Sequence, residues 1–174
     1  MDVYVESNFV LELALQQEGH KSCRDIVDLC QRSSIGLVIP AFCLPEAYYA
    51  LIGKRKQRDG LISAFATEQG QLLRSERYKG RSEQLEAVRS MLIASIAHDS
   101  EDFRACLTII LETARVIPLD KGILKSATTL EQGMDVQLPD SIVLASVIAD
   151  QETQPRVRVA SSTKTRKTSM TPTL

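Results

Sequence analysis

Short apolar runs alternate along the chain with segments of helical periodicity, and this alternation constrains the fold more than any other feature. The apolar run at 35–39 and the short segment Arg115-Val116-Ile117 are too short for helices, and each is followed by a proline, which is typical of buried strands. The segments between them carry apolar residues three and four positions apart, as amphipathic helices do. Strands separated by helices favour a parallel sheet. We therefore predict an α/β fold, a central parallel sheet of about four to five short strands flanked by helices, with strand runs at 3–5, 35–39, 115–117 and 156–160.

One long stretch departs from the alternation. From about 57 to 113 no strand signal occurs and polar-rich helical patterns fill the segment, so we predict a helical insertion there. Asp99 and Ser100 predict the start of a separate helix that covers 103–113. Asp120 predicts the N-cap of a helix that runs over about 121–132. The remaining helices are expected after Ser7, over about 21–32, from Pro45 onward and over 141–150.

Charge is distributed unevenly along the 174 residues. Up to residue 155 there are 16 basic and 22 acidic residues, whereas 156–174 holds five basic residues and no acid. We expect one domain over 1–160 and a poorly ordered, basic, Ser/Thr-rich tail over 161–174. A mildly acidic domain does not indicate nucleic-acid binding by its bulk charge, so any such binding must use local patches. No apolar run is long enough to span a membrane and the acidic start does not resemble a secretory signal, so we expect a cytoplasmic protein.

Three acidic residues occupy the positions where ligands bind in parallel α/β sheets, beyond the carboxyl ends of the strands. Glu6 directly follows the first strand run, while Glu46 and Asp140 fall in the first turns of helices. Favourable electrostatics at a helix start is one explanation for Glu46 and Asp140. The other is a shared site, in which a divalent cation offsets the repulsion among three carboxylates. Hard oxygen ligands suit Mg²⁺ or Mn²⁺, and such a site supports phosphodiester hydrolysis.

The segments around these acids resemble the motifs of PIN-domain nucleases, in particular the small ribonucleases of bacterial toxin–antitoxin systems. The first is Tyr4-Val5-Glu6-Ser7-Asn8, the second runs from Ile39-Pro40 to Pro45-Glu46-Ala47, and the third is Leu138-Pro139-Asp140-Ser141. Their order and spacing agree with the family over about 1–160. The resemblance implies a PIN-like fold and a metal-dependent endoribonuclease that hydrolyses RNA. It also implies a homodimer and an antitoxin-type protein partner.

The resemblance also implies roles for individual residues. Glu6, Glu46 and Asp140 would be the catalytic carboxylates and hold Mg²⁺ or Mn²⁺, and Ser7 and Asn8 would orient the first of them through hydrogen bonds. Two departures favour an alternative, a catalytically impaired PIN-fold protein that binds RNA or another protein. The family's first acid is usually aspartate, and a further acid after the last strand is missing here, where 161–166 holds no carboxylate. A phosphatase or phospho-receiver is a third alternative, but Glu6 offers no suitable phospho-acceptor.

A basic run follows the second motif. Lys54, Arg55, Lys56 and Arg58 place four cations within five residues. A solvated helix end explains such a run, because cations near a helix C-terminus are favourable. Alternatively, the four side chains contact RNA phosphates at the mouth of the site.

Overall fold

The computed structural model describes residues 1–32 and 35–153, and its centre is a small parallel sheet. Strands β1 (Asp2–Tyr4), β2 (Gly36–Pro40) and β3 (Ala114–Ile117) lie in the order β1-β2-β3. Val3 pairs with Leu37, and Ile39 pairs with Val116. The expected strands at the start, at 35–39 and at 115–117 are thus confirmed to within one residue. The described sheet has three strands, fewer than expected, and the fourth expected strand at 156–160 and the tail at 161–174 lie outside the described residues.

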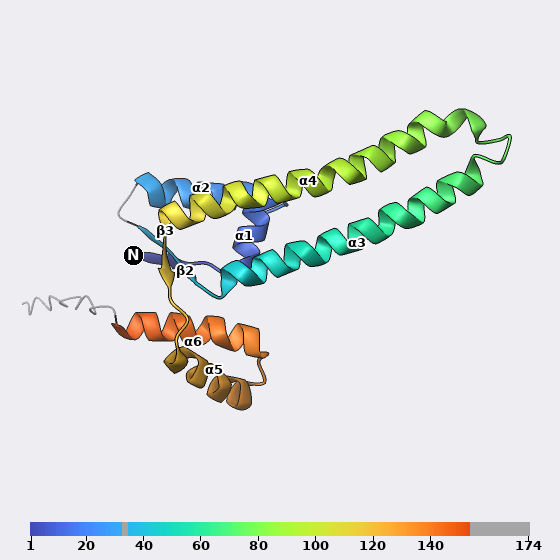
Figure 1. Ribbon diagram of the computed structural model, residues 1–174. Coiled ribbons are helices and arrows are strands. Elements are labelled where there is room, and N and C mark those ends of the chain that lie inside the picture. Colours follow the sequence, from blue (N-terminus) through green and yellow to red (C-terminus); the bar gives the residue numbers. More distant parts are fainter. Residues whose placement is uncertain (33–34, 154–174) are drawn as a thin grey trace, which may run out of the picture.

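Helices cover both faces of β2, which explains why this strand reads as a continuous apolar run. Successive side chains of a strand point to opposite faces. Leu37 and Ile39 accordingly join the core formed with α1 (Ser7–Ala14), α2 (His20–Arg32) and the inner ends of two long helices. Val38 joins a second core, formed with α5 (Lys121–Met134) and α6 (Leu138–Thr153). Figure 1 shows α1 and α2 on one side of the sheet and α5 and α6 on the other.

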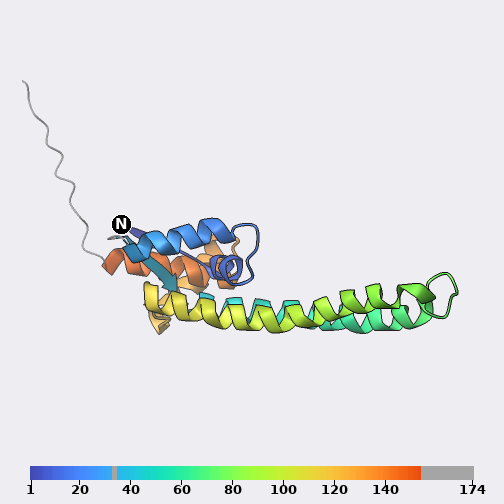
Figure 2. The same cartoon turned by 90° about the horizontal axis from the view of Figure 1, so that it is seen from above.

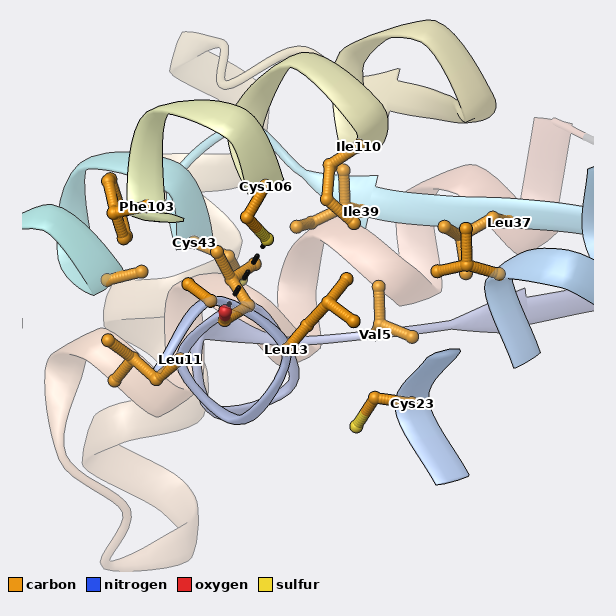
Figure 3. Packing of buried hydrophobic residues seen from close by; sticks show 14 of the residues in the cluster. Val5, Leu11, Leu13, Cys23, Leu37, Ile39, Cys43, Phe103, Cys106 and Ile110 are labelled. Carbon is orange, nitrogen blue, oxygen red and sulfur yellow. Dashed lines mark hydrogen bonds between the residues drawn. The ribbon is translucent and has the colours of Figure 1, made fainter. Parts of the chain in front are cut away.

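The larger core lies where α1 meets the long helices. Val10, Phe103 and Ile110 are almost completely buried there, and the Cys106 thiol contacts the Val10 carbonyl oxygen at 3.7 Å. Figure 3 shows Phe103, Cys106 and Ile110 beside α1, together with Ile39 of β2 and Cys43. Because protein interiors are close-packed, this core fixes α1, and with it the end of β1, relative to α4 (Ser82–Thr113).

The helical segment expected over about 57–113 belongs to a pair of long antiparallel helices, α3 (Cys43–Leu72) and α4 (Ser82–Thr113), joined by a turn that contains the 3₁₀-helix η1 (Lys79–Arg81); the helix expected from Pro45 onward is the first part of α3. Both views show the pair running side by side away from the rest of the molecule (Figures 1 and 2). We call residues 59–98 the arm. The seam between its helices follows a heptad spacing, with half-buried residues at 62, 65, 69 and 72 on α3 and at 85, 89, 92 and 96 on α4.

The separate helix predicted over 103–113 is wrong, because α4 continues through residues 99 and 100 without a break. Neither side chain caps a helix. The Asp99 carboxylate accepts a hydrogen bond from the Arg58 guanidinium at 2.5 Å, and the Ser100 hydroxyl donates to the Ile96 carbonyl. Asp120 does cap α5, since its carboxylate accepts from the Ile123 N–H at 2.8 Å.

A set of polar contacts ties the amino end of the sheet to the end of α6. The Asp150 carboxylate accepts a hydrogen bond from the Tyr4 hydroxyl at 2.7 Å and two from the Arg115 guanidinium. Arg115 also donates to Asp2 at 3.0 Å. We call these four residues the Arg115 clasp. It joins β1, β3 and α6, with Asp2 and Arg115 in the first two residues of their strands and Tyr4 at the end of β1.

Candidate functional site

Glu6 occupies the junction between β1 and α1. It is the N-cap residue of α1, with extended backbone dihedral angles, but its side chain makes no capping hydrogen bond. Its carboxylate is exposed and accepts a hydrogen bond from the Asn8 side-chain amide at 3.2 Å. The side chain at this junction is therefore turned outward, beyond the strand end, with Asn8 fixing one of its oxygens.

Glu46 lies in the first turn of α3, directly after β2, and is half-buried. The positive end of the helix dipole favours a carboxylate at this position. One turn earlier on the same helix, Cys43 is completely buried. Glu46 thus stands at the rim of the larger core, with its carboxylate beside a buried thiol.

The negative charges of Glu6 and Glu46 both influence the pKa of the buried Cys43 thiol. Its pKa is raised to about 12, mainly by burial, then by the negative charge of Glu46 and to a smaller extent by that of Glu6. A hydrogen bond from the Ser7 backbone N–H to the sulfur acts in the opposite direction. The β1–α1 and β2–α3 junctions therefore place Glu6 and Glu46 each within Coulombic range of the same buried thiol. A thiol with a pKa this high stays protonated and has no nucleophilic role at neutral pH.

Asp140 lies in the first turn of α6 and is exposed. In both ribbon views the start of α6 lies at the end of the sheet where α1 and α3 begin (Figures 1 and 2). The next residue, Ser141, is completely buried, and its hydroxyl has no hydrogen-bond partner among the described residues. An unpartnered buried hydroxyl is uncommon and costs about 1–3 kcal/mol. It marks this end of α6 as a place where polar groups are not satisfied by the fold alone.

The fit of these residues to a divalent metal ion is partial. Carboxylate oxygens are the ligands that Mg²⁺ prefers, and one or two carboxylates with water and substrate phosphate commonly suffice to bind it. Glu6 and Glu46 supply two. Within 1–32 and 35–153, however, no three His, Cys, Asp or Glu side chains gather closely enough to hold an ion. Asp140 shares the end of the sheet with the two glutamates without completing such a group.

The basic run lies two to three turns beyond Glu46 on α3. Lys54 and Lys56 are exposed, Arg55 is half-buried, and Arg58 already forms the ion pair with Asp99. Lys54 and Arg58 line a groove of about 380 Å³ at the root of the arm, together with Gln57 and Asp99. The two lysines are therefore the members of the run most accessible to a phosphate group.

A second groove, of about 460 Å³, adjoins Glu6. Apart from that carboxylate its lining is largely apolar: Val3, Tyr4, Val5, Phe9, Ile26, Val143 and Val147. Such a surface does not attract phosphate, whereas Lys54 and Lys56 on α3 carry exposed positive charge.

Two features of the site were not assigned a role from the sequence. Nothing in the sequence around Cys43 shows that the Ser7 backbone N–H reaches its sulfur or that the charges of Glu6 and Glu46 act on it. The missing partner of Ser141 becomes visible only when every neighbour is placed. For Ser141 the one available signal was its position directly after Asp140 in the third motif.

No family model, curated protein or solved structure matches this chain. Among the described helices none is both long and apolar enough to cross a membrane.

Proposed function

We propose that this protein is a metal-dependent endoribonuclease of PIN-domain type that hydrolyses RNA phosphodiesters, and that it acts as the toxin of a toxin–antitoxin pair. The observation that carries the proposal is that Glu6 and Glu46 stand at the strand–helix junctions that follow β1 and β2, two adjacent parallel strands. The region beyond the carboxyl ends of such strands is the place where α/β proteins bind ligands.

In this proposal Glu6, Glu46 and Asp140 are the carboxylates that hold Mg²⁺ or Mn²⁺. The bound ion supplies an activated water and offsets charge on the reacting phosphate. Asn8 orients the Glu6 carboxylate through its amide N–H, and Ser7 anchors the start of α1 on Cys43. Lys54 and Lys56 contact phosphates on one side of the scissile bond, with Arg55 and Arg58 contributing positive charge behind them.

The experiment is cleavage of a structured RNA pool by the purified protein in the presence of Mn²⁺. Asp140→Asn and Glu46→Gln remove one carboxylate charge each while nearly preserving shape. Asp25→Asn, at an exposed position on α2, is the matched control. We expect cleavage by the wild type and by Asp25→Asn, and at least a hundredfold slower cleavage by the two site variants and in EDTA. Cleavage that survives both site substitutions, or chelation of the metal, would refute the proposal.

A second candidate function is supported by two observations. No three potential ligands are gathered among the described residues, and the first acid is Glu6 rather than the usual aspartate. We infer from these an alternative in which a PIN-fold protein without catalysis binds RNA or another protein. Thermal unfolding with and without Mn²⁺ separates the two, because an ion that binds only the folded state raises the unfolding temperature. Stabilisation by Mn²⁺ that Asp140→Asn abolishes supports the nuclease, whereas RNA binding without stabilisation or cleavage supports the alternative.

A further inference from the structure

The middle of the arm has no charge on any face. Residues 60–67 of α3 and 90–97 of α4 are all glycine, alanine, serine, threonine or apolar residues. The two stretches face each other, because the Arg58–Asp99 ion pair lies at one end of them and a Gln69–Glu86 hydrogen bond of 3.4 Å lies near the other. We call these sixteen residues the uncharged band. Helices that remain in water normally carry charged residues on their outer faces.

The uncharged band also exposes large apolar side chains outside the seam. Leu61 is 54% and Met91 64% exposed, and Ile93 is exposed as well. Around them stand small residues, among them Ser63, Ala64 and Ala94, which allow another helix to approach closely. Apolar residues beside a heptad seam are typical of helices that pack against more than one neighbour.

A pair of helices alone gives this region little stability. No residue from 59 to 98 is buried, so even the seam residues Phe65, Leu92 and Ile96 keep part of their apolar surface in water. Long isolated helices depend on tertiary packing of an apolar face for most of their stability. The arm therefore has apolar surface that a further pair of helices would bury.

We propose that the arm binds the arm of a second copy of this chain, with the two uncharged bands forming the centre of an antiparallel four-helix bundle. A partner for a surface without charges must itself present none there, since an unpaired charge buried in the contact is costly. A second copy meets this condition, and a twofold axis places each band on the other. This proposal is independent of the nuclease activity.

The size of the face is sufficient for such a contact. The uncharged band is about 12 Å long, the outer turns of the arm extend the helices to about 21 Å beyond Arg58, and two helices side by side are about 20 Å wide. The flat footprint is on the order of 400 Å² per copy. Interdigitating side chains bring the total buried surface to about 1,000 Å², the lower end for a specific interface. We therefore expect a reversible dimer with a concentration-dependent mass.

The test is the mass of the full-length protein by light scattering over a concentration series. Leu61→Glu combined with Met91→Glu places charges in the uncharged band at exposed positions where the fold does not need the apolar side chain. Leu111→Glu is the matched control, because Leu111 is 56% exposed on α4 but lies outside the arm. We expect a dimer for the wild type and for Leu111→Glu, and at least a tenfold higher dissociation constant for the double variant, with unchanged helical circular dichroism.

A second measurement keeps the proposal testable if the double variant fails to fold. Ala64→Cys places a thiol in the uncharged band one turn after Leu61 and on the same side of α3, and Ser126→Cys places one at another exposed position, on α5. Oxidation should yield a disulfide-linked dimer of Ala64→Cys well above the wild-type background, and none of Ser126→Cys. A wild type that stays monomeric throughout the series, a folded double variant that still dimerises, or equal crosslinking of both cysteine variants would overturn the proposal.

Discussion

Replacing Asp150 by alanine should destabilise the protein by about 2 kcal/mol. The Asp150 side chain is 8% exposed and accepts hydrogen bonds from the Tyr4 hydroxyl and the Arg115 guanidinium. A hydrogen bond contributes about 1 kcal/mol net, and one to a charged group about 1.5–3 kcal/mol. Arg115 is 45% exposed and keeps its contact with Asp2, so water can solvate its guanidinium when Asp150 is removed. We therefore assign about 1 kcal/mol to the Arg115–Asp150 pair.

The assay is urea unfolding at neutral pH, compared with thermal unfolding. For a chain of this length about 2 kcal/mol corresponds to a fall of about 4–8 °C in Tm. Asp28→Ala serves as the control, because the Asp28–Arg32 pair spans 3.9 Å on the exposed face of α2 and contributes little. A double-mutant cycle of Asp150→Ala with Arg115→Met should give a coupling energy of about 1 kcal/mol. If Asp150→Ala unfolds at the same urea concentration as Asp28→Ala, or if the cycle shows no coupling, the clasp does not hold α6 to the sheet.

Three further predictions concern the core, a helix end and the buried thiols. Ile110→Ala should lower the free energy of unfolding by about 2–5 kcal/mol in urea titrations, because Ile110 is completely buried and its removal leaves a cavity; a loss below about 1 kcal/mol would contradict the packing described for α4. Asp120→Ala should cost about 1 kcal/mol, whereas Asp120→Asn, which can still cap α5, should cost less, and equal losses would refute the capping role. The pKa of Cys43 is raised from 9.0 to about 12 and that of Cys106 to about 11, so their contribution to stability is complete below pH 9 and is lost as the pH rises toward those values. The free energy of unfolding should therefore fall by about 1.4 kcal/mol per pH unit and thiol above pH 9, and Cys43→Ala should remove part of that slope; an unchanged slope would show that Cys43 is not buried as described.

Local signals predicted the elements whose boundaries are decided locally. The proline-terminated runs at 35–39 and 115–117 became β2 and β3, and Asp120 caps α5 as its position suggested. Asp99 and Ser100 have the same local character as a cap, but the heptad seam with α3 continues past them, and Asp99 instead pairs with Arg58. Tertiary packing overrides a cap signal when the apolar surface buried by continuing the helix stabilises the fold more than the capping hydrogen bond would.

At the candidate site, too, the positions of the residues along the chain were predictable, whereas their arrangement in space was not. Glu6, Glu46 and Asp140 were expected at strand–helix junctions or first turns, and each lies there. Whether three such positions form one group depends on side-chain directions that the sequence pattern does not contain. The Arg115 clasp had no sequence signal at all, because Tyr4 and Asp150 are 146 positions apart and neither belongs to a motif.

Helix α3 carries both the proposed catalytic region and the proposed dimer contact, at different positions along its length. It carries Glu46 in its first turn, the exposed Lys54 and Lys56 two to three turns further on, and the uncharged band from residue 60 onward. At about 1.5 Å per residue, the lysines begin about 12 Å and the uncharged band about 21 Å from Glu46 along the helix. A phosphate backbone that reaches Glu46 can thus follow the first turns of α3 and contact the lysines, while a second copy occupies the arm beyond them. Loss of self-association should therefore leave the cleavage rate per chain unchanged, and loss of the carboxylates should leave the dimer intact.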